Sequence, residues 1–217
     1  MTGLTPDILL RAYAAGIFPM AETAEDTELF WVDPERRGVL PLDKFHLPRR
    51  LARTLRREVF EIRLDRDFAG VIRGCAEAAP DRPQTWINRQ IVALYSELHK
   101  SGQAHSIEAW HQGRLAGGLY GVSLGGAFFG ESMFSRETDA SKVALATLVA
   151  LLRQGGYRLL DVQFVTEHLR RFGAVEIPRA RYHRILGDAI KTPSYFPDGP
   201  LGGADVATIL QSSTLTS

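Results

Sequence analysis

Apolar residues along this chain recur with two different spacings, and the change between them organises the sequence. Up to about residue 100 they mostly recur every three or four positions, which is the spacing of one face of an amphipathic helix. From residue 105 they form alternating or continuous runs interrupted by glycines, which is typical of strands. After residue 139 helical and strand-like segments alternate. The pattern therefore predicts helices packed against a sheet.

The helical segments have recognisable ends. Thr5 can cap the first helix, Pro6 suits its first position and Gly16 can end it. Asn88 and Asp139 can cap two later helices in the same way. We predict little structure after Lys191, and helices at residues 5–16, 48–58, 66–79, 88–102, 139–155, 167–172 and 179–189.

The strand-like segments are short, and three of them are consecutive. Glycine-bearing connections join these three, so their pairings should be antiparallel. The middle one contains Gly117, Gly118 and Gly121, which predicts a bulge or a close backbone approach. The predicted strands cover residues 60–64, 105–110, 114–122, 126–133, 157–165 and 175–177.

The order of these elements predicts the fold class. A meander followed by a strand–helix–strand unit gives an α/β protein with a mixed sheet and helices on both faces. This layout resembles the fold of the acyl-coenzyme A N-acyltransferases, known as GNAT-like, and by itself it does not define a substrate. We predict a small N-terminal subdomain at residues 1–36, packed on a main domain at residues 37–217.

Composition narrows the class of protein further. Of the 217 residues 45% are apolar and 24% charged, and the formal net charge is +1, so nucleic acid could bind only at a local basic patch. A single cysteine, Cys75, excludes an intramolecular disulfide and fits a reducing compartment. The chain has no signal-peptide pattern and no apolar run of about 18 residues. We therefore expect a cytoplasmic protein without membrane association.

Two places combine polar groups with apolar surroundings. Glu131 follows Gly130 within an apolar run, so it either faces solvent at a strand end or has a binding partner. Asp161 and Gln163 are two residues apart on a predicted strand and should share a face. They are either an ordinary polar strand end or a pair in which the carboxylate orients the amide. An amide oriented in this way could accept a hydrogen bond from an attacking amine.

The predicted helix after Pro48 carries a dense positive charge. Leu51 and Leu55 form its apolar stripe, and Glu58 is the nearest carboxylate that could balance the charge. Such a run is either a solvated helix face or a surface that holds phosphates. Its arginines are Arg49, Arg50, Arg53, Arg56 and Arg57.

Several other chemistries lack their motifs. The six histidines have no metal-ligand spacing, and the chain has neither a Gly-x-Ser-x-Gly elbow nor a phosphate loop. The turn at residues 135–142 has no glycine and carries two carboxylates, so it does not suit the pyrophosphate of coenzyme A. We therefore expect an acyl donor other than coenzyme A, and neither a metal nor a cofactor.

Seven segments in order resemble the leucyl/phenylalanyl-tRNA–protein transferase family. Together they run from the first predicted helix to the last. They are Ala14-Ala15-Gly16-Ile17-Phe18-Pro19, Thr85-Trp86-Ile87, His105-Ser106-Ile107-Glu108, Gly117-Gly118-Leu119-Tyr120-Gly121, Gly130-Glu131-Ser132-Met133-Phe134-Ser135, Asp161-Val162-Gln163 and Gly173-Ala174-Val175-Glu176-Ile177-Pro178-Arg179.

The resemblance implies aminoacyl transfer from charged tRNA to proteins with N-terminal Arg or Lys, which marks them for degradation. It implies that Gln163, oriented by Asp161, accepts a hydrogen bond from the attacking amine, and that Glu131 pairs with the cationic acceptor. Trp86 would stack near the terminal adenosine, with Met20 close by, and the five arginines would hold the acceptor stem. The other implied substrate-binding residues are Tyr13, Leu119, Phe128, Phe129, Gly130, Met133 and Ser135.

Two alternatives fit parts of the same pattern. An acyl-coenzyme A N-acyltransferase would share the fold and the strand-borne site. A non-catalytic tRNA-binding module would keep the arginine helix and tolerate loss of Glu131 and Gln163. The sequence does not rank Leu, Phe and Met as donors.

Overall fold

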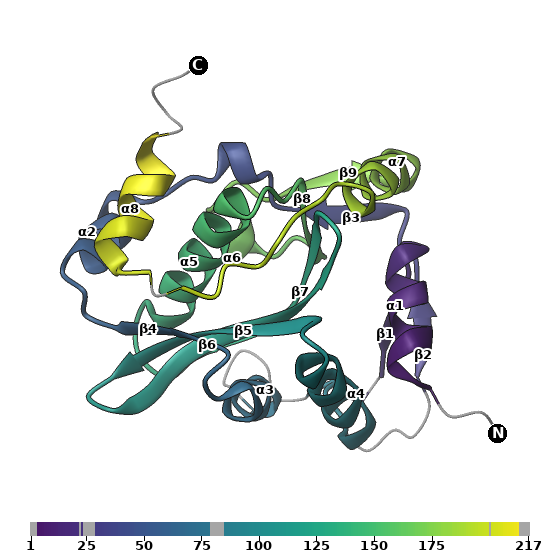
Figure 1. Ribbon diagram of the computed structural model, residues 1–217, viewed down its shortest axis with the longest axis horizontal. Helices are drawn as coiled ribbons and strands as arrows, with labels where there is room; N and C mark the ends of the chain where they lie inside the picture. Colours follow the sequence, from purple (N-terminus) through teal and green to yellow (C-terminus); the bar gives the residue numbers. More distant parts are fainter. Residues whose placement is uncertain (1–3, 22, 24–28, 79–84, 200, 213–217) are drawn as a thin grey trace.

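The computed structural model describes residues 4–21, 23, 29–78, 85–199 and 201–212 (Figure 1). Within these residues a mixed seven-stranded sheet is the centre of the molecule. Strands β7 and β8 pair in parallel, and the other neighbouring strands are antiparallel, as predicted for the meander. In spatial order the strands are β4 (Glu61–Leu64), β5 (Ala104–His111), β6 (Arg114–Leu124), β7 (Ala127–Ser135), β8 (Leu159–Gln163), β3 (Arg36–Val39) and β9 (Val175–Pro178).

Helices cover both faces of this sheet (Figure 1). The predicted caps Thr5 and Asn88 are confirmed, because their side chains accept hydrogen bonds from the backbone N–H groups of Ile8 and Ile91. Asp139 precedes its helix but does not cap it, and its carboxylate pairs with Lys142 instead. The helices are α1 (Pro6–Ala14), η1 (Leu42–Lys44), α2 (Arg49–Arg56), α3 (Phe68–Ala76), α4 (Arg89–Lys100), α5 (Ala140–Gln154), α6 (Glu167–Arg170), α7 (Arg179–Ile190) and α8 (Gly203–Ser212).

Two apolar cores lie on opposite faces of the sheet. One gathers around α5, which is buried along most of its length, and includes residues of α2 and α8. The other contains residues of α1, α3, α4 and α7. Cys75 is buried in this second core, as expected for a small apolar residue.

Two elements of the main sheet and its helices were absent from the sequence prediction, as were the short strands at residues 18–20 and 30–32. Residues 36–39 form β3, which inserts between β8 and β9, although the segment has no alternating pattern. The segment after Lys191 contains α8, so the expectation of little structure there was wrong. This helix can approach α2 because Gly203 lies against the backbone of Leu55, where a Cβ atom would be 2.3 Å from the Leu55 carbonyl oxygen. The last residues, 213–217, lie outside the described part of the chain.

The sheet opens next to the middle of β7. Parallel pairing of β7 with β8 ends at Phe129 and Asp161, whereas β7 continues to Ser135 alongside β6. The register of β6 and β7 shifts next to Gly121, which confirms the predicted irregularity. A Cβ atom at Gly121 would be 2.3 Å from the Phe129 carbonyl oxygen, so glycine is required there. Glu131 and Gln163 therefore lie where the two strands separate.

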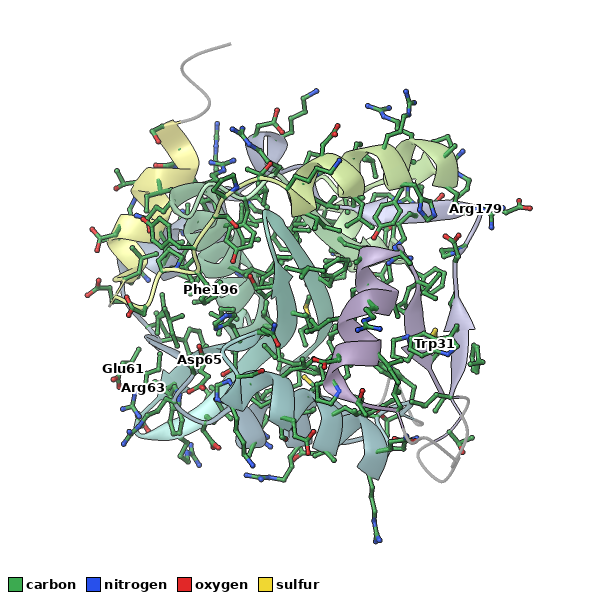
Figure 2. The ribbon with its side chains drawn as sticks, turned by 45° about the vertical axis from the view of Figure 1, so that its right-hand side comes forward. Trp31, Glu61, Arg63, Asp65, Arg179 and Phe196 are labelled. Carbon is green, nitrogen blue, oxygen red and sulfur yellow. The ribbon has the colours of Figure 1, made fainter. Side chains whose placement is uncertain are left out.

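The N-terminal segment adds a second, two-stranded sheet. Strand β1 (Phe18–Met20) pairs antiparallel with β2 (Phe30–Val32), and Trp31 of β2 lies at the surface (Figure 2). The predicted subdomain boundary falls where β3 begins, and it stays a prediction. Among the described residues no helix has the length and apolar character needed to cross a membrane.

Candidate active site

A cavity of about 730 Å³ fills the opening between β7 and β8. Its volume is within the usual range for small-molecule sites. Apolar side chains of α5, β6, β7 and β8 form much of its wall, and residues of β1, α3, α6 and the segment before α4 also line it. The lining includes Leu119, Met133, Leu145, Leu148, Leu160 and Val162, together with Met20 and Trp86.

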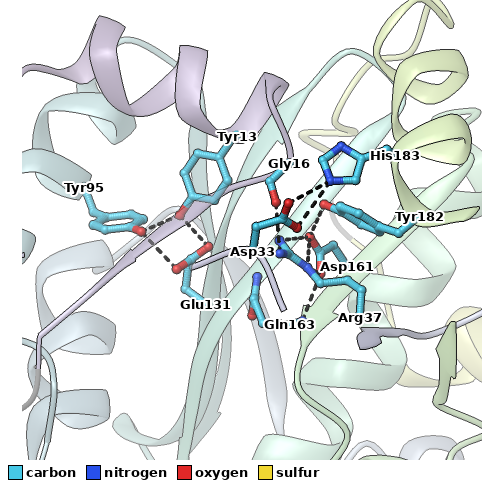
Figure 3. Close-up of polar contacts among 10 residues, drawn as sticks. All are labelled: Tyr13, Gly16, Asp33, Arg37, Tyr95, Glu131, Asp161, Gln163, Tyr182 and His183. Carbon is cyan, nitrogen blue, oxygen red and sulfur yellow. Dashed lines mark hydrogen bonds and ion pairs between the residues drawn. The ribbon is translucent and has the colours of Figure 1, made fainter. Parts of the chain in front are cut away.

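Glu131 brings a carboxylate to this cavity. It is partly buried, and its two oxygens accept hydrogen bonds from Tyr13 Oη at 2.7 Å and from Tyr95 Oη at 2.9 Å. The two tyrosine hydroxyls also bond to each other, and both side chains are fully buried (Figure 3). The carboxylate therefore has binding partners, which excludes the reading in which it only faces solvent.

The surroundings of Glu131 disfavour its charged form. Burial raises the pKa of this carboxyl group to about 7, although the hydrogen bonds from Tyr13 and Tyr95 act in the opposite direction. This value already includes a smaller raising effect of the nearby Asp161 carboxylate and a lowering effect of Arg37. Burial, together with the charge of Glu131, keeps the pKa values of both tyrosines well above their ordinary range. Glu131 can therefore change its charge near neutral pH, and the tyrosines remain neutral donors.

Asp161 is the second carboxylate, and its setting is different. It is fully buried on β8 and forms an ion pair with the equally buried Arg37 of β3, at 2.7 Å. Arg37 donates through Nε and Nη2, and Tyr182 of α7 donates its hydroxyl at 2.6 Å (Figure 3). Burial by itself would lower the pKa of Arg37, but Asp161 raises it above its ordinary value. The pair is thus a fixed ionic contact inside the protein.

Gln163 ends β8 and lines the cavity. Its backbone has a φ of +55°, and its main-chain N–H donates to Asp161 Oδ1 at 2.9 Å. The amide Nε2 is buried and has no hydrogen-bond partner among the described residues. Asp161 therefore holds Gln163 through the backbone, which corrects the expectation that the carboxylate binds the side-chain amide.

The remaining predicted substrate-binding residues divide into two groups. Six of them line the cavity, whereas Tyr13 lies behind Glu131, and Phe128 and Phe129 are completely buried away from it. Successive strand residues point to opposite faces, so these two phenylalanines belong to different cores and support the sheet instead. The six lining residues are Met20, Trp86, Leu119, Gly130, Met133 and Ser135.

Three residues of the site were not singled out from the sequence. Arg37, Tyr95 and Tyr182 donate hydrogen bonds to the two carboxylates, in addition to Tyr13 and the Gln163 backbone N–H. Tyr95 and Tyr182 follow the helical apolar pattern, so they read as ordinary core residues. Arg37 is one of two adjacent arginines before a glycine, and only its pairing with β8 places it beside Asp161.

The arginine-rich helix α2 lies outside the cavity. Arg49, Arg50, Arg53, Arg56 and Arg57 are all exposed, and none of them lines the cavity. Arg50 approaches Asp139, directly before α5, at 3.8 Å, and Arg56 bonds to Gln211 of α8 at 2.6 Å. Ser141 of α5 lines the cavity, and Asp139 lies two residues before it. The exposed arginines of α2 therefore lie next to one wall of the cavity through the contact of Arg50 with Asp139.

Taken together, the site is an apolar cavity with a carboxylate and an amide, which suits acyl transfer from an activated donor. Residues 39–187 match the family described as leucyl/phenylalanyl-tRNA protein transferase, and residues 3–35 match the N-terminal domain of that transferase. The chain belongs to the leucyl/phenylalanyl-tRNA–protein transferase family, whose members are aminoacyltransferases.

Similar curated proteins extend over nearly the whole chain. A leucyl/phenylalanyl-tRNA–protein transferase of Paramagnetospirillum magneticum is 58% identical over 209 residues, which cover 96% of this chain and 100% of the relative. The transferase of Rhodopseudomonas palustris strain HaA2 is 58% identical over 211 residues, covering 95% and 94%. The transferase of strain TIE-1 is 56% identical with the same coverage.

Among solved structures, a C-terminal domain (DUF2156) from Agrobacterium fabrum is similar to this chain. It is 14% identical, the match covers 97% of this chain and 70% of the other, and the TM-score is 0.35. A likeness of this size carries no argument about fold or function.

Proposed function

We propose that this protein transfers Leu or Phe, with Met as a further candidate donor, from charged tRNA to proteins that begin with Arg or Lys. The observation that carries the proposal is that Glu131 and Gln163 line one apolar cavity. The cavity provides space for an apolar aminoacyl side chain, and its polar groups lie where the two strands separate.

The transfer joins the acceptor's α-amine to the aminoacyl group. The amine nitrogen attacks the ester carbonyl carbon, the C–N bond forms, and the bond from that carbon to the ribose oxygen breaks. The departing ribose oxygen receives the proton that the amine loses, so an amide and an alcohol replace the amine and the ester. The ester is already activated, so the protein mainly holds both reactants in attack geometry.

The polar residues have distinct roles in this proposal. Gln163 accepts a hydrogen bond from the attacking amine through its side-chain carbonyl. Glu131 pairs with the cationic acceptor, because it is a carboxylate at the cavity whose partners are neutral hydroxyls. Asp161 keeps Gln163 in place by accepting a hydrogen bond from its backbone N–H.

The donor is held at three places. The apolar wall around Leu119, Met133 and Leu148 receives the aminoacyl side chain. Trp86 and Met20, which line the same cavity, pack against the terminal adenosine. The exposed arginines of α2 hold the acceptor stem through its phosphates without reading sequence.

The GNAT-like fold, the N-terminal subdomain and the cellular location are part of the same proposal. The antiparallel meander followed by the β7–α5–β8 unit supports a GNAT-like main domain, and the segment up to residue 36 is its N-terminal subdomain. The protein acts in the cytoplasm, where its tRNA donors are, and marks proteins for degradation by their N-terminal residue.

A transfer assay tests the proposal. The protein is mixed with tRNA charged with Leu, Phe or Met and with peptides that begin with Arg, Lys or Ala. We expect extension of the Arg and Lys peptides and none of the Ala peptide, with Leu or Phe as the best donor. Intact charged tRNA and no extended peptide would contradict the proposal. Extension from an acyl-coenzyme A in place of charged tRNA would do the same.

A further inference from the structure

The acceptor sites of Asp161 are all occupied by protein donors. An ionised carboxylate offers about four lone-pair sites. Arg37 fills two of them with Nε and Nη2, Tyr182 fills a third with its hydroxyl, and the Gln163 backbone N–H fills the fourth. The residue is also fully buried. Asp161 therefore has no site left for a substrate proton or for the Gln163 amide.

Arg37 links this carboxylate to the N-terminal segment. Its Nη1 donates to the Gly16 carbonyl oxygen at 3.0 Å, just beyond the end of α1. Its guanidinium group lies 4.4 Å from the ring centre of Phe18 and 4.5 Å from that of Tyr182. A buried arginine that is hydrogen-bonded to Asp161 and Gly16 and packed between two aromatic rings is held in one position. The position of Asp161 is therefore set by β3, α7 and the end of α1 together.

The held carboxylate stabilises an unusual backbone at Gln163. A φ of +55° is disfavoured for a residue with a side chain, and such conformations persist only where the surroundings impose them. Here Asp161 Oδ1 accepts a hydrogen bond from the Gln163 N–H. On the other side, Gly38 of β3 packs closely against the backbone after Gln163, because a Cβ atom at Gly38 would be only 2.9 Å from the Phe164 carbonyl carbon. This backbone aims the Gln163 side chain at the cavity.

We propose that Arg37 and Tyr182 are positioning residues of the transfer reaction, which fix Asp161 so that it holds Gln163 in its left-handed conformation. The inference rests on the proposed function of the cavity. In this arrangement Asp161 takes no proton during transfer, and its charge is balanced by Arg37 throughout. The N-terminal segment takes part in the site through Gly16.

A double-mutant cycle tests this inference. Tyr182→Phe removes one hydrogen-bond donor to Asp161 and keeps the aromatic ring. Gln163→Ala removes the side chain that Tyr182 is proposed to position through Asp161. With saturating Leu-tRNA and an Arg-initiated peptide, Tyr182→Phe should lower kcat about tenfold, the size expected for a lost hydrogen bond to a charged group. In the Gln163→Ala background the same change should alter kcat by less than about twofold, because residues that act through one another are not additive.

Matched measurements separate positioning from folding. Tyr157→Phe removes the hydroxyl of another buried tyrosine, which bonds to Ser123 of β6 and does not line the cavity, and it should leave kcat unchanged. The KM for Leu-tRNA should stay the same in Tyr182→Phe. Single-turnover reactions with excess enzyme measure the slow variants. Arg37→Lys, which keeps the charge but not the fork of donors, should lower kcat in the same Gln163-dependent way.

Two outcomes would overturn the inference. One is a kcat equal to that of the unmodified protein in both Tyr182→Phe and Arg37→Lys. The other is an equal loss of kcat with and without the Gln163 side chain, because the effect would then not pass through Gln163. An unmodified protein that transfers no aminoacyl group would instead overturn the proposed function itself.

Discussion

Glu131 and Asp161 are carboxylates on neighbouring parallel strands, and they differ in burial and in the charge of their hydrogen-bond partners. Glu131 lines the cavity, its partners are two neutral tyrosines, and its pKa is raised to about 7. Asp161 is fully buried and paired with a buried arginine. The ion pair of Asp161 with Arg37 is therefore a structural contact of the folded protein. The charge of Glu131 is left available to respond to a cation in the cavity.

The largest expected effect concerns the buried pair. Asp161→Asn leaves Arg37 without its anion, and breaking a buried ion pair costs about 3–5 kcal/mol of folding free energy. Denaturant unfolding at neutral pH measures this loss. Glu131→Gln is the matched variant, and it should unfold at the same or a higher denaturant concentration. Equal destabilisation by the two substitutions would remove the distinction between the carboxylates.

The second effect concerns acceptor use and its pH dependence. If the ionised Glu131 pairs with the acceptor, kcat/KM for an Arg-initiated peptide should rise with pH around 7 in the unmodified protein. Glu131→Gln should lower kcat/KM about tenfold or more at pH 8, as expected for loss of a charged hydrogen-bond partner.

The ratio of the two kcat/KM values isolates Glu131. The acceptor's own α-amino group also titrates, with a pKa of about 8, but it does so equally for both proteins. The ratio should therefore increase with pH and level off above 7. A ratio that stays constant from pH 5 to pH 9 would show that Glu131 does not titrate in this range.

The third effect is smaller and concerns stability. Because the pKa of Glu131 is raised from 4.5 to about 7 in the folded state, the folded protein binds more protons between these values than the unfolded chain does. Stability should therefore fall as pH rises through this window. Relative to Glu131→Gln, the unmodified protein should lose about 2 kcal/mol between pH 5.5 and pH 8. Unfolding curves of both proteins at the two pH values provide the measurement, and a gain would contradict the assignment.

The smallest effect on chemistry is expected on the arginine helix, whose arginines do not line the cavity. Replacing Arg49, Arg53 and Arg56 together by glutamine should leave kcat at saturating tRNA unchanged and stability within about 0.5 kcal/mol, since all three are exposed. The salt dependence of tRNA binding should become shallower by about two to three in the log–log slope.

A second triple variant controls for net charge. Arg114, Arg181 and Arg184 are also exposed and lie on β6 and α7. Replacing them by glutamine removes the same charge from other surfaces and should change the slope less. Equal slopes for the two triple variants would make α2 an ordinary solvated face.

Much of the fold could be predicted from the sequence because its elements have local signals. Thr5 and Asn88 cap their helices through their own side chains, and the glycine turns impose the antiparallel meander. Strand β3 had no such signal, because Arg36-Arg37-Gly38-Val39 becomes a strand only through its pairing with β8 and β9. Helix α8 likewise depends on contacts with distant parts of the chain, α2 and α5.

The candidate site shows the same division. The positions of Glu131, Asp161 and Gln163 could be singled out, because polar residues in apolar runs require partners. Their partners come from distant segments, and so the donors Arg37, Tyr95 and Tyr182 could not be predicted. The expected contact between Asp161 and the Gln163 amide assumed regular strand geometry, which the positive φ at Gln163 does not have.

One measurement tests the central contrast most directly, namely the KM for an Arg-initiated peptide in Glu131→Gln and in Asp161→Asn, with Leu-tRNA saturating. If Glu131 faces the acceptor and Asp161 holds the catalytic amide, Glu131→Gln should raise this KM about tenfold or more. Asp161→Asn should mainly lower kcat and leave the KM within about twofold. An unchanged acceptor KM in Glu131→Gln, or the same increase in both variants, would contradict the account.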